Sequence, residues 1–345
     1  MSDPNHISEY PWLQQIPKLE WEEKKTIISE IDKLKKQRDA LILGHNYMEP
    51  ALYHSVADVT GDSLELCRQA ATTGKPVLVF CGVEFMAETA KIINPTSQVL
   101  IPSQKAGCSL ASSITAEDVR ALKRSYPGVP VVSYVNTYAE IKAETDVCCT
   151  SGNASHIVNT LNSDTVIFIP DEYLARNIAK ETGKHVIFPS KDPRQNPALE
   201  TSIQKIFIGW HGKCEVHDKF ETEDIAQVRE QFPDAVILAH PECKPEVVEQ
   251  ADFSGSTSAM IKYVEKSSSH SQILLLTECA MGDNIIAANP HANLLRLCSV
   301  RCPHMAQITL EDTRDSLKFL QYEINLDPII IEKARRSIDA MLAMS

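Results

Sequence analysis

The sequence lacks a long apolar run and has no apolar segment near its start. The first 30 residues contain no hydrophobic stretch of the kind that forms the core of a signal peptide. No run elsewhere approaches the roughly 20 apolar residues that a membrane-spanning helix needs. We therefore expect a cytoplasmic protein that neither spans a membrane nor is secreted.

Positive charge is also scarce. The chain carries 34 Lys and Arg against 46 Asp and Glu, a formal net charge of -12. Proteins that bind nucleic acid neutralise phosphates with clustered Lys and Arg, and no basic block occurs here. The charge argues against nucleic-acid binding as the main task.

Cysteine is present but sparse, with 10 residues in 345. This is too few for a disulfide scaffold in a chain of this length, so we expect reduced thiols or metal ligands. Cys298 and Cys302 miss by one residue the Cys-x-x-Cys spacing that lets two thiolates meet on one zinc ion. The spacing does not suit a local zinc knuckle, so Cys302 either packs alone as a small apolar residue or has partners elsewhere in the chain.

The composition is otherwise that of a folded globular protein, with 43% hydrophobic and 23% charged residues, and the length suits two or three domains. Short apolar runs alternate with polar helical stretches, which is typical of an α/β fold with buried parallel strands. The runs form three sets, each made of three runs: 41–46, 77–82 and 99–108; 131–136, 166–171 and 206–214; 236–242, 273–278 and 294–302.

The three sets share further features in the same order. The opening runs end on His45, Asn136 and His240. A hydroxyl motif then precedes a helix-like stretch, at 61–66, 150–157 and 255–261, and each set closes on a cysteine. Because these features recur in the same order in all three sets, the sequence predicts three related αβα sandwich domains with short parallel sheets. We expect the domains to be arranged with pseudo-threefold symmetry around a central active site.

We place the domains at residues 1–115 plus 315–345, 116–219 and 220–314. The first includes terminal helices expected at 25–40 and 327–344. The edges fall at 116–130 and 220–235, which both resemble amphipathic helices that stop near a proline.

The closing cysteines of the three sets are Cys108, Cys214 and Cys302. Three thiolates without an equivalent fourth leave a metal centre one protein ligand short, as in catalytic sites. Soft thiolates select zinc, cuprous copper or iron-sulfur clusters. A four-iron cluster held by these residues would keep one iron open as a Lewis acid for substrate.

Polar residues near the strand ends complete the candidate site. Ser63, Ser151, Ser256 and Thr257 lie where helices begin, and helix N-termini offer backbone N–H groups to anions. Ordinary capping is the alternative interpretation. The acid and base candidates are His45, Tyr47, His217, His240 and Glu242.

From about residue 35 onward the chain resembles the quinolinate synthase family. The resemblance rests on these segments, in family order: GHNY, GDSLE, CGVEFMAETAKI, YVNTYAEIKA, DVCCTSGNA, IPDEYLARNI, WHGKCEVHD, HPEC, GSTSAM and CPHM. It implies a three-domain fold and a 4Fe-4S cluster bound by Cys108, Cys214 and Cys302. It also implies condensation of iminoaspartate with dihydroxyacetone phosphate to quinolinate, with loss of phosphate and water, in NAD biosynthesis.

The resemblance also implies roles for single residues. Tyr47 and Glu242 would transfer protons, with His45 and His240 beside them. Asn136 would orient a substrate carbonyl or carboxylate, Tyr134 would help to close the site, and His217 would lie near cluster and phosphate. The hydroxyls of Ser63, Ser151, Ser256 and Thr257 would hold carboxylate or phosphate groups.

Partners follow from the same resemblance. The family is coupled to L-aspartate oxidase or aspartate dehydrogenase as a source of iminoaspartate, and we expect a monomer or homodimer. Some members carry a Cys-x-x-Cys-x-x-Cys run at the last ligand, whereas this chain has only Cys298 and Cys302. The departure puts a disulfide switch there in doubt and leaves Cys298 as a bystander. Cys243 is the remaining cysteine that is hardest to dismiss.

Two other interpretations stay open at this stage. A different cluster-dependent hydro-lyase acting on a small hydroxy acid would also need an open iron and anion sites. An iron or oxygen sensor that responds to cluster loss is the other interpretation.

Overall fold

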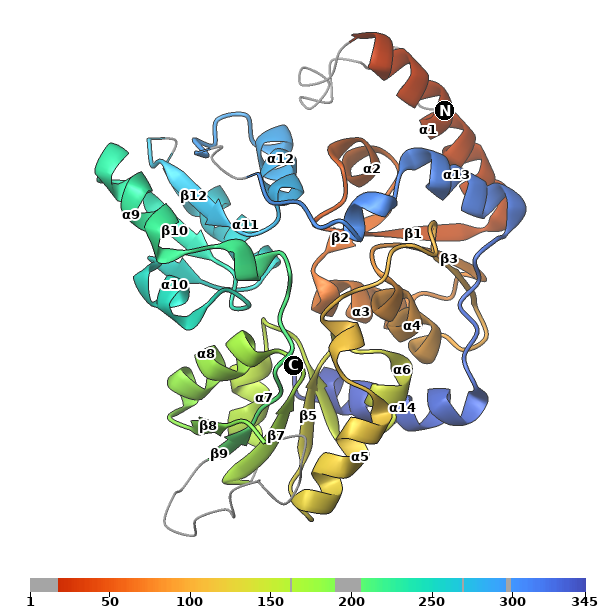
Figure 1. The fold of residues 1–345 in the computed structure, drawn as a ribbon. Coiled ribbons are helices and arrows are strands. Elements are labelled where there is room, and N and C mark those ends of the chain that lie inside the picture. Colours follow the sequence, from red (N-terminus) through yellow and green to blue (C-terminus); the bar gives the residue numbers. More distant parts are fainter. Residues whose placement is uncertain (1–17, 162, 190–205, 269, 296–298) are drawn as a thin grey trace.

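The computed structural model describes residues 18–161, 163–189, 206–268, 270–295 and 299–345. It contains three separate sheets, and every strand pair in them is parallel. Figure 1 shows the sheets in three lobes, each flanked by helices. The structure therefore has the predicted α/β class with several short parallel sheets. None of the helices in the described ranges is both long and apolar enough to cross a bilayer.

The first sheet is built from the N-terminal part of the chain. Its strands are, in spatial order, β2 (Val59–Gly61), β1 (Ala40–His45), β3 (Val77–Cys81) and β4 (Gln98–Leu100). The helices along this segment are α1 (Lys18–Arg38), α2 (Pro50–Ser55), α3 (Ser63–Thr72) and α4 (Glu84–Ile93). All five residues of β3 are buried, as expected for a parallel strand covered on both faces.

The second sheet is the largest. Its strands are, in spatial order, β6 (Val147–Cys149), β5 (Val131–Tyr134), β7 (Thr165–Ile169), β9 (Ile206–Ile208) and β8 (His185–Ile187). The helices along this segment are α5 (Ala116–Ser125), α6 (Ala139–Lys142), α7 (Ala154–Thr160) and α8 (Glu172–Thr182). Phe168 and Phe207 stack between β7 and β9 with ring centroids 5.1 Å apart and fill the core of this unit.

The third sheet is the smallest. Its strands are, in spatial order, β11 (Phe253–Ser254), β10 (Val236–Ala239) and β12 (Ile273–Leu276). The helices along this segment are α9 (Thr222–Gln231), α10 (Pro245–Gln250), α11 (Thr257–Lys266) and α12 (Cys279–Ala288). Leu294 adds a single parallel bridge beside Ile273, so the last apolar run starts where a further strand would lie.

All three sheets place their opening strand in the same way. Each opening strand lies between a short edge strand and the second strand of its set, in the orders β2-β1-β3, β6-β5-β7 and β11-β10-β12. The first two apolar runs of every set are strands, as predicted, whereas the sequence analysis missed the short edge strands. The repeat seen in the sequence is thus a repeat of topology.

An aspartate fastens each edge strand to its opening strand. Asp58, Asp146 and Asp252 precede β2, β6 and β11, and their Oδ2 atoms accept the backbone N–H of Ile42, Val131 and Ile237 at 2.7–2.8 Å. The backbone N–H of each aspartate returns a bond to the carbonyl of the same partner. In all three sheets, the carboxylate of the aspartate before the edge strand thus accepts a backbone N–H of the opening strand and extends the ladder of hydrogen bonds by one residue.

The helix after each set packs on the next unit. Val119 and Leu122 of α5 lie in the core of the second sheet, and Ile225 and Val228 of α9 lie in the core of the third. The third such helix, α13 (Leu310–Phe319), returns to the first unit and packs on α1 and β3. The chain thereby closes on itself, as Figure 1 shows for the blue helix beside α1.

The C-terminal helix α14 (Pro328–Ala343) packs on α6, β6 and α4, so it contacts both the first and the second unit. The predicted terminal helices are therefore present as α1 and α14. The domain boundaries stay predictions, and the one at residue 314 falls inside α13.

Candidate active site

A cavity lies where the carboxyl ends of β1, β5 and β10 meet. It is lined by every predicted site residue except Ser256: His45, Tyr47, Ser63, Cys108, Tyr134, Asn136, Ser151, Cys214, His217, His240, Glu242, Thr257 and Cys302. Carboxyl ends of parallel strands are where open α/β sheets bind ligands. The structure thus brings residues from all three sets to one place.

The three cysteines sit in matching loops. Each is followed by a short 3₁₀ helix that begins three residues later: Ala111–Ser113, His217–Lys219 and Met305–Gln307. The carbonyls of Cys108, Cys214 and Cys302 each accept the backbone N–H four residues on, at 2.9–3.0 Å. The helices α5, α9 and α13 then begin at residues 116, 222 and 310, eight residues after each cysteine.

These loops aim backbone N–H groups at the sulfur atoms. Ala111 donates to Sγ of Cys108 and Met305 to Sγ of Cys302, both at 3.5 Å. The N–H groups of Val216 and His217 act in the same way on Cys214 and offset part of the rise that burial causes in its pKa. Hydrogen bonds to sulfur are one of the means by which proteins tune metal-bound thiolates.

Burial nevertheless has the largest effect on the pKa values of these three thiols. It raises the pKa of Cys108 to about 12 and raises the pKa of Cys214 and Cys302 as well. All three are therefore protonated near neutral pH unless a cation stabilises the thiolate.

None of the other described cysteines lines the cavity. Cys243 is fully buried and its Sγ donates to the carbonyl of Leu276 at 3.5 Å. Cys298 lies outside the described residues. The prediction of reduced thiols is wrong for Cys279, because this residue is disulfide-bonded. Its backbone N–H donates to the carbonyl of Val300 at 3.0 Å, which places the segment before Cys302 beside it.

His45 and His240 occupy equivalent positions after β1 and β10. The Nδ1 atom of His45 accepts the backbone N–H of Tyr47 at 3.2 Å, and Nδ1 of His240 accepts that of Glu242 at 3.3 Å. Burial lowers the pKa of His45 to about 4 and that of His240, which is also beside His217, to about 3. Both rings are therefore neutral and carry their proton on Nε2, ready to donate.

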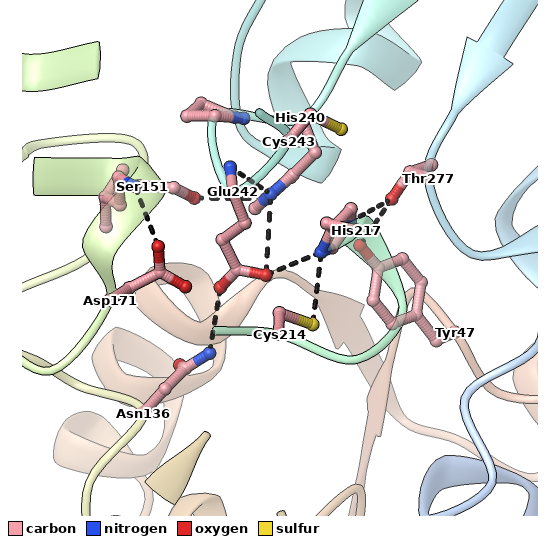
Figure 2. A network of polar contacts seen from close by, with 12 residues as sticks. Tyr47, Asn136, Ser151, Asp171, Cys214, His217, His240, Glu242, Cys243 and Thr277 are labelled. Atoms are coloured by element: carbon pink, nitrogen blue, oxygen red, sulfur yellow. Dashed lines mark hydrogen bonds and ion pairs between the residues drawn. The ribbon is translucent and has the colours of Figure 1, made fainter. Parts of the chain in front are cut away.

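Glu242 is the ionised centre of the polar network in Figure 2. Its Oε2 lies 2.6 Å from Nδ1 of His217, and its Oε1 accepts from Nδ2 of Asn136 at 3.1 Å. Burial alone would raise the pKa of this carboxyl, but the charge and hydrogen bond of His217 lower it to about 2.

A chain of hydrogen bonds runs from Glu242 to Tyr47. The Nε2 atom of His217 lies 3.0 Å from Oγ1 of Thr277, and this hydroxyl lies 2.6 Å from the Tyr47 hydroxyl (Figure 2). Burial raises the pKa of Tyr47 well above its usual range, so its hydroxyl stays protonated. The cavity therefore holds a carboxylate and a phenol joined by two further groups.

The hydroxyl motifs differ from the expectation in one respect. Asp62 caps α3 and its Oδ1 takes the N–H groups of Leu64 and Glu65, so the carboxylate occupies donors that were assigned to a substrate anion. Ser256 caps α11 and donates to Oδ2 of Asp62 at 3.0 Å. Ser63 and Thr257 are the first residues of α3 and α11, and both line the cavity. The residue before each of them caps its helix.

Ser151 precedes α7 by three residues and lies outside the first turn of that helix. Its hydroxyl is 3.4 Å from Nε2 of His240, which is the nitrogen that carries the proton. Ser151 and His240 thus form one donor pair in the cavity wall (Figure 2).

Tyr134 and Asn136 come from the end of β5. Burial raises the pKa of Tyr134 well above its usual range, and Glu242 adds to the effect. The Oδ1 atom of Asn136 is buried and has no hydrogen-bond partner in the part of the chain that is described. An acceptor of this kind in a cavity wall suits a ligand N–H or O–H group.

Asp62, Asp171 and Thr277 are among the polar residues near the site that the sequence did not indicate. Asp171 is fully buried, caps α8 through Leu174 and faces Glu242 in Figure 2. Burial, and next the Glu242 charge, raise its pKa well above its usual range, so it is neutral. Asp171 and Thr277 follow the second strands β7 and β12, whereas the predicted polar strand ends belong to the opening strands.

A cavity at strand ends that gathers neutral histidines, an ionised carboxylate, a protonated phenol and three thiols is the site of an α/β enzyme. Comparison with known proteins gives the particular family. The family described as Quinolinate synthetase A protein matches residues 29–343. Quinolinate synthase 2 of Mesorhizobium japonicum is 49% identical over 329 residues, which cover 95% of this chain and 94% of the relative.

Two further relatives agree. Quinolinate synthase 1 of Mesorhizobium japonicum is 46% identical over 340 residues, 98% of each chain, and quinolinate synthase of Xylella fastidiosa is 49% identical over 317 residues, 92% of this chain and 87% of the relative. The chain belongs to the quinolinate synthase family.

Proposed function

We propose that the chain condenses iminoaspartate with dihydroxyacetone phosphate to quinolinate, with loss of phosphate and water, in NAD biosynthesis. The observation that carries the proposal is the convergence of Cys108, Cys214 and Cys302, in matching loops, on the cavity that also holds Tyr47 and Glu242. Membership of the quinolinate synthase family supports the reaction.

The cysteines fit a 4Fe-4S cluster better than a single ion. A tetrahedral ion holds its donors roughly 3–4 Å apart. Among the described residues, the single group of three donors whose atoms lie within 4.8 Å of one another is Cys214, His217 and Glu242, so the three sulfur atoms are more widely spaced. A cluster of four irons spans such spacing.

The described lining of the cavity contains no fourth cysteine. A cluster held by Cys108, Cys214 and Cys302 would keep one iron without a protein ligand, and that iron would supply Lewis-acid chemistry to a substrate oxygen or nitrogen. The N–H groups directed at the sulfur atoms would offset part of the cluster's negative charge.

The neutral histidines and hydroxyls would bind the anionic parts of the substrates. His45 and His240 present Nε2–H to the cavity, and Ser151 lies beside the latter. Ser63 and Thr257 add hydroxyls from helix starts. These groups would hold carboxylate and phosphate oxygens, because N–H and O–H donors suit acceptor-only anions. Ser256, whose hydroxyl donates to Asp62, would act through that carboxylate.

Proton transfer would use Glu242 as base and Tyr47 as acid. Glu242 is ionised and Tyr47 protonated, and the two are joined through His217 and Thr277. Asn136 would orient a substrate carbonyl or carboxylate with its remaining amide N–H, and Tyr134 would close the wall beside Glu242. Groups whose pKa values are driven apart are suited to opposite roles in acid–base catalysis.

The test is anaerobic incubation of the iron-loaded chain with freshly generated iminoaspartate and dihydroxyacetone phosphate, followed by chromatography for quinolinate. Product that appears with wild type and disappears with Cys214→Ser supports the proposal. A loaded wild-type chain that makes no quinolinate would favour a hydro-lyase or a sensor instead.

An aspartate-oxidising enzyme, such as L-aspartate oxidase or aspartate dehydrogenase, would supply iminoaspartate to this cytoplasmic enzyme.

A further inference from the structure

We propose that Cys214, His217 and Glu242 form a second, mononuclear metal site that takes Zn²⁺ when the chain is free of iron and sulfide. The three residues are donors of different chemistry within one small space. Sγ of Cys214 lies 3.3 Å from Nδ1 of His217, and Nδ1 lies 2.6 Å from Oε2 of Glu242. All three donor atoms lie within 4.8 Å of one another.

This donor set matches zinc. Zn²⁺ binds thiolate, imidazole and carboxylate, and catalytic sites supply three protein ligands. Roughly 3–4 Å separates the donors around a tetrahedral ion, so a small movement of the Glu242 carboxylate away from His217 suffices. Zinc also binds N and S donors more tightly than ferrous iron does.

Each donor is held by a partner outside the site. The Nε2 atom of His217 lies 3.0 Å from the Thr277 hydroxyl, which leaves Nδ1 for the ion, and the second oxygen of Glu242 accepts from Asn136 at 3.1 Å. Backbone N–H groups of Val216 and His217 support the Cys214 sulfur. Partners of this type orient metal ligands and raise metal affinity.

The site is distinct from the cluster although it shares one sulfur. It uses neither Cys108 nor Cys302, whereas the proposed cluster needs both. Because Cys214 cannot serve both centres at once, zinc and the cluster exclude each other. This consequence rests on the proposed function, whereas the zinc site itself does not.

The first experiment titrates the full-length, iron-free, reduced chain with Zn²⁺ against a chromophoric chelator, and with Co²⁺ as a spectroscopic probe. We expect one tightly bound ion and a cobalt spectrum with one thiolate ligand. His217→Ala and Glu242→Gln should weaken zinc at least about 100-fold, since each removes a ligand, and Thr277→Val should weaken it about 10–100-fold through loss of support.

Cys108→Ser and Cys302→Ser are the matched controls and should bind zinc as wild type does. Zinc affinity that falls with these two variants and survives His217→Ala would overturn the site, because the ion would then use the three cysteines. Unchanged affinity in all variants would also overturn it. Circular dichroism and the thermal midpoint check folding, and Thr277→Val keeps the test decisive if His217→Ala does not fold.

The second experiment loads the chain with one equivalent of Zn²⁺ before anaerobic reconstitution with iron and sulfide. Iron incorporation should fall in proportion to bound zinc in wild type and stay unaffected in His217→Ala. If full cluster assembles while the zinc stays bound, as metal analysis after gel filtration shows, Cys214 is not a cluster ligand. That result would refute the cluster assignment and leave the zinc site standing.

Discussion

The Nδ1 atom of His217 lies 2.6 Å from Oε2 of Glu242, and both side chains are almost fully buried. His217 belongs to the loop of Cys214, and Glu242 follows β10. This pair therefore ties one of the three cysteine loops to the polar end of an opening strand. The pair therefore connects the proposed cluster site directly to the proposed acid–base groups.

Glu242→Gln tests the base. The amide keeps the size of the side chain but carries no charge and cannot accept a substrate proton. We expect quinolinate formation to fall about 10²–10⁴-fold, the range for loss of a general base. The measurement is product formation by anaerobic chain with matched iron content, and a variant that keeps near wild-type activity would show that Glu242 is not the base.

The cluster ligands are tested by single serine substitutions. Cys108→Ser, Cys214→Ser and Cys302→Ser should each lose the brown colour and the bound iron and sulfide of the anaerobic preparation. Cys67→Ala is the control, because Cys67 is buried in α3 away from the cavity lining and should keep its cluster. Retention of full iron by any of the three serine variants would remove that residue from the ligand set.

The sequence predicted the α/β class, and all but one of the predicted site residues line the cavity, because apolar runs and strand-end polar residues repeat in order. It could not predict the edge strands β2, β6 and β11, since two or three residues carry no readable period. Asp58, Asp146 and Asp252 were overlooked for the same reason. Their role depends on a partner strand some 15 residues away.

The sequence also could not show what the residues do to one another. Ser63 appears free to bind an anion until Asp62 is seen to occupy the N–H groups of that helix turn. The ionisation of Glu242 depends on His217, which is 25 residues away in the chain. Contacts between loops of different units set these properties, and no local pattern records them.

The aspartates of the edge strands make a stability prediction. Asp58→Ala, Asp146→Ala and Asp252→Ala each leave a backbone N–H of a buried opening strand without its acceptor, which costs about 1–3 kcal/mol. Urea or thermal unfolding measures the loss. Asp234→Ala, at an exposed position before β10, is the control and should change stability by less than about 0.5 kcal/mol. Equal effects from control and test variants would contradict the role.

His45 makes a pH prediction. Burial lowers its pKa from 6.5 to about 4 in the folded chain, so between these values the unfolded chain binds the extra proton. The free energy of unfolding should therefore fall as pH drops from 6.5 towards 4, with up to about 1.4 kcal/mol per pH unit from this ring. His45→Gln should show a shallower fall over that window in urea unfolding. Identical slopes for variant and wild type would contradict a neutral buried ring.

The most direct measurement of the central claim is the rate of quinolinate formation across a series of anaerobic preparations loaded with increasing iron and sulfide. The account predicts a rate that rises in proportion to cluster content and vanishes in iron-free chain. Quinolinate made equally well without iron, or no quinolinate from fully loaded chain, would contradict it.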